Sequence, residues 1–515
     1  MSARGLRNMS YSLKHVAEQI GLADIRPLAK RTHLEFAAQL SDASGQRIWL
    51  KREDQQAVFS FKIRGAANRI SKLSHKERTR GVVAASAGNH AQGIAAAAAH
   101  FNMDAVIFMP ITTPSIKTKA VEARGAKIKL VGDSYDEACE AAIEHANKTG
   151  ALFIHPFDEL DVIAGQGTIG QEILDQLATK PAAVYVAVGG GGLIAGIGAY
   201  LRIHSPETKI YAVEPEGAAT LKTSLSSGKP TALNRVDGFA DGVAVKQIGD
   251  VTFDLAQKIK PISILVSSDE ICAAAKSIFE QTRTVVEPAG ALALAGLLAH
   301  AQSDEAPRGD VVAIVTGANV NFDRIGHMVE RAELGGGREI LFAASLPEKP
   351  GSFLRFCQAL GKHAVSEFNY RYADTKTAHV LVGVKTQSPE EGEALMQAIR
   401  DIGMTVTDMS GNALAKEHLR HMVGGRATSK AREEIYSFEF PERPGALRDF
   451  LTALDGRWNI SLFHYRNHGA AAGQVLCGFQ IPNDDAHALE ASLQQTGFSM
   501  RLETNNPAYQ YFLKS

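Results

Sequence analysis

One lysine stands in an apolar segment near the start of the chain. Lys62 lies in VFSFKIRGA, residues 58–66, with Phe61 and Ile63 on either side of it. A buried, unpaired ammonium is costly, so a lysine amine held among apolar groups has a lowered pKa and becomes a nucleophile that can form a Schiff base with an aldehyde. The alternative is a lysine that extends to the surface from a strand-to-helix corner. Only the neighbouring motifs distinguish the two.

A second segment that could bind a ligand is SAGNHAQG, residues 86–93. It follows the apolar run GVVAA and opens an alanine-rich stretch. Such a turn directs backbone N–H groups and a helix N-terminus at an anion. A substrate carboxylate therefore fits at the start of this segment, and an ordinary helix N-cap explains the same residues equally well. The candidate carboxylate-binding residues are Ser86, Ala87, Gly88, Asn89 and His90.

A third segment, VGGGGLIAG at residues 188–196, joins another apolar strand to another helix. Four consecutive glycines expose a row of N–H groups with no side chains in the way, which favours a phosphate-binding loop. The segment lacks the Lys-Ser/Thr of a P-loop and fits GxGxxG poorly. A flexible linker is the alternative, although a strand and a helix frame the glycines on both sides.

A fourth segment, VTGAN at residues 315–319, ends a third strand and places the hydroxyl of Thr316 where it can bond a ring nitrogen. Alone, this piece is better explained as a structural β-turn. Together, the four segments supply a lysine for an aldehyde, a loop for one phosphate, a loop for a carboxylate and a neutral partner for a ring nitrogen. That combination predicts pyridoxal phosphate acting on an amino acid.

Alternating strands and helices must position these residues. Short apolar runs separated by alanine-rich helical stretches predict a mostly parallel α/β sheet, in which ligands gather beyond the carboxyl ends of the strands. Three of the runs end near Ser86, Gly189 and Thr316. The predicted strands are residues 81–86, 104–110, 127–132, 184–190, 209–215 and 311–317.

The sequence pattern changes at ELGGGREI, residues 333–340, and an internal repeat follows. SLPEKPGSFLRFCQAL resembles EFPERPGALRDFLTAL, and EFNYRY resembles LFHYRN, with copies about 95 residues apart. Each copy predicts a small α+β module. We expect a catalytic domain at 1–333 (smaller lobe roughly 50–160), a Gly-rich linker at 334–339, modules at 340–412 and 435–505, and a connector at 413–434.

The motifs SFKIRGA, SAGNHAQG, GGGGLIAG and VEPAGAL (286–292) resemble those of the fold type II pyridoxal-phosphate enzymes, in the threonine/serine dehydratase branch. The C-terminal pair resembles the tandem ACT-like domains of biosynthetic threonine dehydratases. The resemblance implies that Lys62 bonds the cofactor, that Asn89 hydrogen-bonds its phenolic oxygen and that Thr316 faces the pyridine nitrogen. The implied cofactor-binding set also includes Phe61, Gly189, Gly190, Gly191, Gly192 and Leu193.

The resemblance also implies an activity and its control. An enzyme of this family deaminates L-threonine to 2-oxobutanoate and ammonia, the first step of isoleucine biosynthesis, and acts on L-serine as well. It is a homotetramer that isoleucine inhibits and valine activates through the C-terminal modules. Effector-lining candidates are Phe353, Tyr370, Leu447 and Tyr465, for which plain core packing is an equal alternative.

Two other functions compete with this one. A serine-preferring dehydratase or racemase shares the catalytic motifs but lacks the tandem modules, and a catalytically silent sensor would not need Lys62 and the glycine loop. Some relatives bind a divalent ion at EPxxAxD, whereas this chain has EPEGAAT at residues 214–220. Glu214 is present but Thr220 replaces the acid, so no metal is expected.

Composition excludes other classes of protein. The 515 residues carry 55 Lys plus Arg against 56 Asp plus Glu, a net charge of −1 that argues against nucleic acid or an anionic membrane as a partner. The four cysteines lie far apart without a CxxC pair, which is typical of a reducing cytosol. We find no secretory signal and no apolar run of membrane-spanning length, and expect a cytoplasmic protein.

Overall fold

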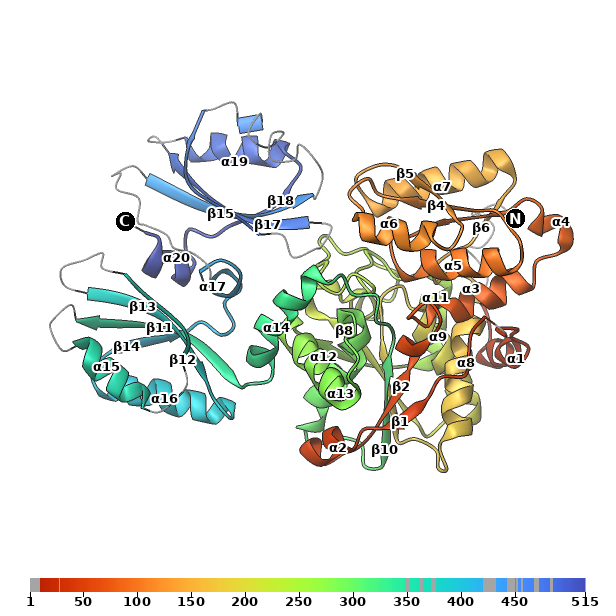
Figure 1. Ribbon diagram of the computed structural model, residues 1–515, viewed down its shortest axis with the longest axis horizontal. Coiled ribbons are helices and arrows are strands. Elements are labelled where there is room, and N and C mark those ends of the chain that lie inside the picture. Colours follow the sequence, from red (N-terminus) through yellow and green to blue (C-terminus); the bar gives the residue numbers. More distant parts are fainter. Residues whose placement is uncertain are drawn as a thin grey trace. The chain divides into compact units, whose positions relative to one another are not determined.

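The chain forms two compact units, residues 1–332 and 333–515. A computed structural model describes most of both units (Figure 1). The described residues are 10–26, 28–347, 352–361, 363, 365–371, 377–419, 432–441, 450, 453–454, 457–466, 472–481 and 485–514.

The first unit is built on a six-stranded sheet of order β1-β2-β10-β7-β8-β9, parallel except for the β1–β2 pair. Its central strands are apolar on both faces, since Val184 and Val186 of β7 point to one face and Tyr185 and Ala187 to the other. A parallel sheet covered on both faces requires such continuous apolar runs. The strands are β1 (Leu34–Phe36), β2 (Arg47–Arg52), β7 (Ala183–Ala187), β8 (Lys209–Pro215), β9 (Ile262–Val266) and β10 (Asp310–Val315).

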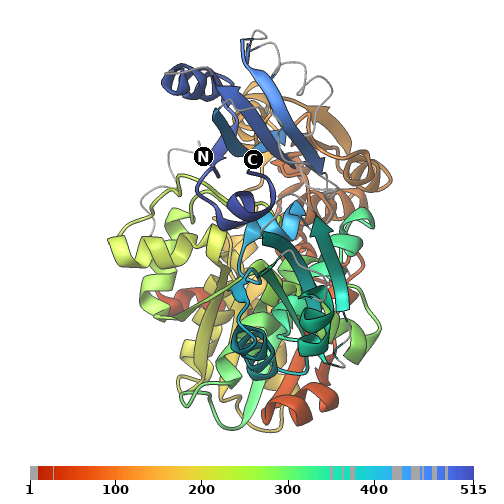
Figure 2. The same cartoon turned by 90° about the vertical axis from the view of Figure 1, so that its left-hand side faces the viewer.

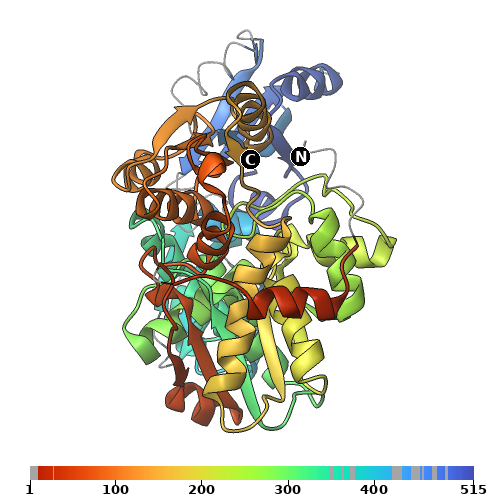
Figure 3. The same ribbon diagram turned by 90° about the vertical axis from the view of Figure 1, so that its right-hand side faces the viewer.

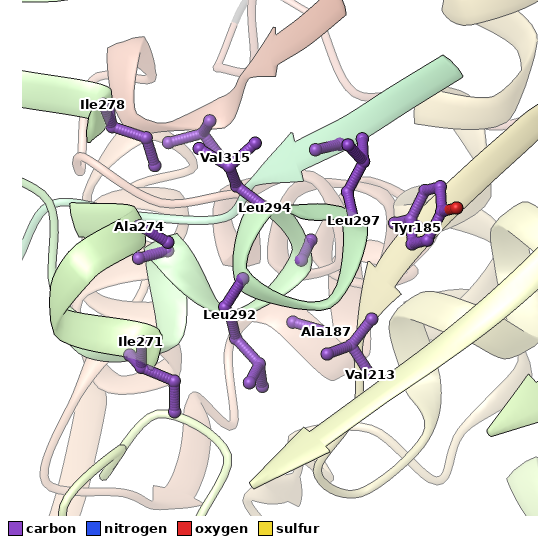
Figure 4. Packing of buried hydrophobic residues seen from close by; sticks show 14 of the residues in the cluster. Tyr185, Ala187, Val213, Ile271, Ala274, Ile278, Leu292, Leu294, Leu297 and Val315 are labelled. Atoms are coloured by element: carbon purple, nitrogen blue, oxygen red, sulfur yellow. The ribbon is translucent and has the colours of Figure 1, made fainter. Parts of the chain in front are cut away.

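Helices cover both faces of this sheet. On one face, α12 and the almost wholly apolar α13 pack on β7, β8 and β10, as Figure 4 shows for Leu292, Leu294 and Leu297. On the other face lie α8, α9 and α11, with α1 across α8 and α9 (Figure 3). The helices are α1 (Leu13–Gly21), α2 (Ala38–Ser44), α8 (Leu160–Gln176), α9 (Gly192–His204), α10 (Thr220–Ser227), α11 (Asp250–Ile259), α12 (Ser268–Thr282), α13 (Pro288–Ala301) and α14 (Asp323–Gly335), with 3₁₀ turns η1 (Glu53–Gln55) and η2 (Glu216–Ala218).

A smaller lobe of the same unit has a four-stranded parallel sheet of order β5-β4-β3-β6. Helices α3 and α5 pack on one face of it, and the alanines of α7 on the other. The elements are α3 (Lys62–Ser71), α4 (His75–Arg78), β3 (Val82–Ala85), α5 (Asn89–His100), β4 (Ala105–Met109), α6 (Ser115–Glu122), β5 (Lys127–Leu130), α7 (Tyr135–Thr149) and β6 (Leu152–Phe153). Each of the six predicted strands is present in one of the two sheets.

The second unit contains two antiparallel sheets with the same strand order, β12-β13-β11-β14 and β16-β17-β15-β18. The fold class predicted from the sequence, a mostly parallel α/β domain followed by paired α+β modules, is confirmed. The first module comprises β11 (Glu339–Pro347), α15 (Ser352–Leu360), β12 (Val365–Arg371), β13 (Thr377–Lys385), α16 (Pro389–Asp401), β14 (Thr405–Asp408) and α17 (Ala413–Glu417); the second comprises β15 (Arg432–Pro441), β16 (Asn459–Arg466), β17 (Ala472–Ile481), α19 (Ala486–Gln495), β18 (Ser499–Leu502) and α20 (Pro507–Phe512).

Besides the core of each module, one apolar cluster spans both modules. Leu341 and Leu381 of the first sheet and Ile435 and Leu476 of the second belong to a single cluster with α17 and α20, which lie next to each other (Figure 2). Each short helix follows the fourth strand of its module and begins at an asparagine N-cap.

These two N-caps meet. The side-chain amide of Asn412 donates a hydrogen bond to the Asn506 side-chain oxygen at 3.0 Å. The contact therefore joins the same position of the two copies, as it would across a local two-fold axis.

The effector-lining candidates fall in these modules. Tyr370 pairs with Val380 in the first sheet, and Tyr465 pairs with Val475 at the matching place in the second. Phe353 lies in α15, and Leu447 lies outside the described residues. For the first three only the backbone position is described. Within the described part of the chain, no helix combines the length and apolar character that a membrane crossing needs.

Candidate active site

The loop after β10 holds the segment that leads to Lys62. Phe59 adopts a left-handed conformation with φ of 55°, and its carbonyl accepts a hydrogen bond from the Ala318 N–H at 2.9 Å. The Phe61 N–H donates to the Thr316 carbonyl at 3.1 Å. Lys62 then begins α3. The fixed turn therefore sets the lysine beside the carboxyl end of β10.

The amine of Lys62 opens on a pocket yet is enclosed by protein. Its Nζ donates to the Pro156 carbonyl at 3.1 Å. Burial lowers the pKa of Lys62 to about 8, against the opposing influence of the Glu287 carboxylate. The amine therefore has a substantial neutral fraction near neutral pH, which is what a nucleophile or a general base requires.

This pKa makes a testable prediction. Below about pH 8 the amine is protonated and unreactive, and above it the amine is free. In the full-length apoenzyme, modification of Lys62 by a small aldehyde should therefore rise with a midpoint near pH 8, and exposed Lys119 on α6 serves as the comparison residue. Peptide mass spectrometry over a pH series measures both residues at once, and identical profiles would contradict the assignment.

The pocket brings together all of the predicted cofactor-binding residues. All nine of them contribute to its lining: Phe61, Lys62, Asn89, Gly189, Gly190, Gly191, Gly192, Leu193 and Thr316. Of the predicted carboxylate-binding residues, only Asn89 lines it. Ser86, Ala87, Gly88 and His90 do not, although they adjoin Asn89 at the N-terminus of α5. The lining also contains Phe157, Val243 and Glu287, which the sequence analysis did not select.

The glycine loop is shaped by close packing. A Cβ on Gly190 would lie 2.2 Å from the Phe157 ring, and one on Gly189 would lie 2.8 Å from the Val243 Cα. Gly191, with φ of 90°, is the N-cap of α9 and offers no side-chain cap. The first N–H groups of a helix have no partner within the helix, so α9 presents free donors and a positive dipole end to the pocket.

Residues 155–158 brace this loop from the smaller lobe's side. Thr252 of α11 donates its hydroxyl to the Gly190 carbonyl at 2.7 Å. The Asp158 carboxylate in turn accepts the Val251 and Thr252 N–H groups of α11 at 2.9 and 3.0 Å. The same short segment supplies Pro156 to Lys62 and Phe157 to Gly190. This segment thus links Lys62 to the glycine loop.

Thr316 and His90 have defined partners. The Thr316 hydroxyl donates to the Ala289 carbonyl at 2.9 Å, which leaves its oxygen as an acceptor toward the pocket. His90 is buried, its Nε2 lies 3.2 Å from the Ile154 carbonyl, and burial lowers its pKa to about 3. The His90 imidazole is therefore neutral at physiological pH.

Glu214 and Thr220 support the glycine loop. The Glu214 carboxylate accepts the Leu221 and Lys222 N–H groups at 2.7 and 2.9 Å at the start of α10. Burial raises its pKa to about 7. The Thr220 hydroxyl donates to the Gly189 carbonyl at 3.1 Å. Among the described residues, no cluster of three or more His, Cys, Asp or Glu side chains is arranged to hold a metal ion.

Known proteins match this chain along most of its length. Residues 25–317 match the family described as pyridoxal-phosphate dependent enzyme, and residues 330–419 and 424–513 each match the C-terminal regulatory domain of threonine dehydratase. The biosynthetic L-threonine dehydratase of Haemophilus influenzae is 47% identical over 94% of both chains.

Solved structures resemble the catalytic unit. The processed form of threonine deaminase isoform 2 from Solanum lycopersicum has a TM-score of 0.61 and 44% identity, covering 62% of this chain and 93% of that one. Maize serine racemase has a TM-score of 0.58 and 30% identity, covering 62% of this chain and 97% of that one.

The pocket fits pyridoxal phosphate. It combines an amine of lowered pKa, the free N–H groups of a helix N-terminus, an amide and a hydroxyl, which match an aldehyde, a phosphate, a phenolic oxygen and a ring nitrogen. With these relatives and both domain matches, the chain belongs to the biosynthetic threonine dehydratases of the pyridoxal-phosphate dependent enzyme family.

Proposed function

We propose that the protein is an L-threonine ammonia-lyase that converts L-threonine to 2-oxobutanoate and ammonia as the first step of isoleucine biosynthesis, and that it also accepts L-serine. This proposal rests on one observation: the similarity to the Haemophilus influenzae relative extends through the catalytic unit and both C-terminal modules. The serine racemase resemblance, by contrast, is confined to 62% of this chain.

In this proposal each part of the pocket holds one part of the cofactor. Lys62 bonds its aldehyde carbon, the N–H groups of Gly189–Leu193 bind its phosphate, and Asn89 donates to its phenolic oxygen. Phe61 lines the ring site. The Thr316 hydroxyl, which donates to the Ala289 carbonyl at 2.9 Å, would turn to donate its proton to the unprotonated pyridine nitrogen. A neutral oxygen there, rather than a carboxylate, favours β-elimination over reactions that need full ring protonation.

The protein groups then act on the substrate. Bound pyridoxal phosphate serves as the electron sink that acidifies the Cα–H bond of the amino acid. The N–H groups of residues 86–90, at the N-terminus of α5, bind the substrate carboxylate. The Lys62 Nζ, with a pKa of about 8, takes the Cα proton as general base. Enclosure of this amine by protein lowers its pKa to about 8, so the neutral form that acts as a base is far more abundant than it is for an exposed lysine.

A product assay tests the reaction. The full-length enzyme should form 2-oxobutanoate from L-threonine and, more slowly, pyruvate from L-serine, both measured with a coupled dehydrogenase. Formation of D-serine without either oxoacid would identify a racemase instead. Absence of all three products in protein that binds the cofactor would favour a silent sensor.

We further propose that isoleucine inhibits and valine activates the enzyme through sites in residues 340–412 and 435–505. Two successive matches to a regulatory domain support this assignment. Phe353, Tyr370, Leu447 and Tyr465 are the candidate lining residues. The apolar cluster that spans both modules supports coupling between them, because an effector bound to one sheet acts on a cluster to which both sheets belong.

Removing the second unit tests where the effectors act. A chain that ends at Leu334 should retain threonine turnover and lose its response to isoleucine, because the binding sites would be gone. In the full-length enzyme, isoleucine coupling of typical size shifts the apparent affinity for threonine by about 5- to 150-fold. Threonine saturation curves with and without isoleucine measure this. Unchanged inhibition of the shortened chain would place the isoleucine site in the catalytic unit.

The proposal includes assembly as a homotetramer, which the family resemblance implies, and a place in the cytoplasm, which the scattered cysteines favour. Size-exclusion chromatography with light scattering gives the mass of the assembly. A monomeric active enzyme would contradict the proposed assembly without affecting the proposed reaction.

A further inference from the structure

Glu287 occupies an unusual position at the start of α13. It is the N-cap residue, directly before Pro288, yet its side chain makes no capping hydrogen bond. Only 4% of the residue is exposed, and it lines the pocket together with Lys62 and Asn89. A buried carboxylate is costly unless it has hydrogen-bond partners. The Glu287 carboxylate is thus directed into the active site and not onto the helix N-terminus.

The neighbouring backbone leaves room for this carboxylate. A Cβ on Gly317 would lie 2.6 Å from the Glu287 Oε1. Gly317 is also the residue whose carbonyl accepts the Glu287 N–H at 3.2 Å. A side chain at position 317 would displace the carboxylate from its present place.

A chain of amide hydrogen bonds ends on Glu287. The Asn319 Nδ2 donates to the Val58 carbonyl at 2.8 Å and to the Asn89 Oδ1 at 2.6 Å. The Asn89 Nδ2 in turn donates to the Glu287 Oε1 at 2.6 Å. Since a carboxylate only accepts, Glu287 fixes which end of the Asn89 amide carries the nitrogen. One N–H of Asn89 is committed to Glu287, and the second is free.

The charged groups around Glu287 are bound to one another. Asp241 forms an ion pair with Lys117 of the smaller lobe at 2.6 Å and lies 3.5 Å from Arg324. Burial, together with Asp241, raises the pKa of Glu287 to about 7, while the Asn89 hydrogen bond, Lys117 and Arg324 oppose the shift. Lys62 also faces Glu287, whose charge raises the lysine's pKa. The direct hydrogen bond from Asn89 is therefore the specific interaction of this carboxyl group.

We propose that Glu287 is a positioning residue for the cofactor. By accepting one N–H of Asn89, it orients the amide so that the second N–H donates to the phenolic oxygen of pyridoxal phosphate. The inference rests on the cofactor role proposed for Asn89 and assigns that role's geometry to Glu287 and Asn319. It predicts that Glu287 affects cofactor binding mainly through Asn89.

A double-mutant cycle on cofactor affinity tests this directly. Full-length apoenzyme of the wild type, Asn89→Ala, Glu287→Ala and the double variant is titrated with pyridoxal phosphate, and the dissociation constant is read from the visible absorption of the bound cofactor. Each single variant should bind about 10- to 100-fold more weakly, the range for hydrogen bonds to charged groups. The double variant should be within about 3-fold of the weaker single variant, because both changes remove one interaction.

A conservative variant and a matched control separate positioning from general damage. Glu287→Gln keeps an oxygen that can accept from Asn89, so its dissociation constant should stay within about 3-fold of wild type. Glu214→Gln alters a carboxylate with a similarly raised pKa of about 7 that caps α10, and its effect should multiply with that of Asn89→Ala.

Two results would overturn the proposal: multiplication of the Glu287→Ala and Asn89→Ala effects, or a Glu287→Gln variant as weak as Glu287→Ala. Asn319→Ala provides a further check, since it should weaken binding without adding to Glu287→Ala. These readouts use cofactor binding alone. If the enzyme failed to deaminate threonine, the proposed reaction would be wrong while the cycle would still report on Glu287.

Discussion

Lys62→Ala is expected to abolish threonine turnover and, with it, the visible absorption band of the lysine-bound cofactor. The substitution removes both the covalent attachment and the amine that takes the Cα proton. Loss of a general base alone lowers rates by about 100- to 10,000-fold, so a residual rate below about one thousandth of wild type is expected. Absorption spectra and the 2-oxobutanoate assay on the same preparation measure the two effects.

The control for this variant must be an ordinary surface lysine. Lys51 is unsuitable, because it is fully buried and its Nζ bonds Glu172 at 2.6 Å, so its removal would break a buried ion-pair network. Lys119→Ala changes an exposed residue of α6 and should leave spectrum and rate near wild type. A Lys62→Ala enzyme that kept a tenth of the wild-type rate would refute the catalytic assignment.

Gly190→Ala should weaken pyridoxal phosphate binding at least about 10-fold. The added methyl group would meet the Phe157 ring at 2.2–2.4 Å, which no real contact tolerates, so the loop or the ring must move. A displaced loop no longer aims its N–H groups at the phosphate. Titration of the apoenzyme measures the affinity, and excess cofactor should restore activity.

Two further variants make the glycine result specific. Gly326→Ala lies in α14, where an added Cβ meets no atom within 4 Å, and should leave cofactor affinity unchanged. Combining Gly190→Ala with Phe157→Ala removes the clashing ring and should recover part of the lost affinity. Unaltered affinity in Gly190→Ala, or no recovery in the double variant, would count against the phosphate-loop assignment.

The strands made of continuous apolar runs could be predicted from the sequence, because a parallel sheet covered on both faces demands such runs. Strand β2 could not be predicted in this way. Its sequence RIWLKR contains three cations, yet Lys51 and Arg52 are buried because Glu172, Glu35 and Asp54 pair with them across the fold. Only Asp54 lies nearby in the sequence; Glu35 and Glu172 come from other elements, and no local pattern predicts that they will neutralise these charges.

The candidate site also contains residues that local sequence predicts and residues that only the fold reveals. Lys62, Asn89, Thr316 and the glycines were predicted because each stands in a strand-to-helix turn whose chemistry is local. Phe157 and Asn319 act through packing and hydrogen bonds that exist only after folding. Glu287 carried a weak signal in VEPAGAL, since the proline after it marks a helix start, and only the structure shows that Glu287 bonds Asn89.

The bond between Asn412 and Asn506 has a consequence for the origin of the regulatory unit. A residue that meets its own counterpart is the mark of an isologous interface, the kind formed by two identical chains about a two-fold axis. The ancestral module would thus have existed as a homodimer with the shared apolar cluster as its interface. Joining the two genes replaced an association that depends on protein concentration with one at an effective concentration on the order of millimolar. Each copy was then free to diverge without losing its partner.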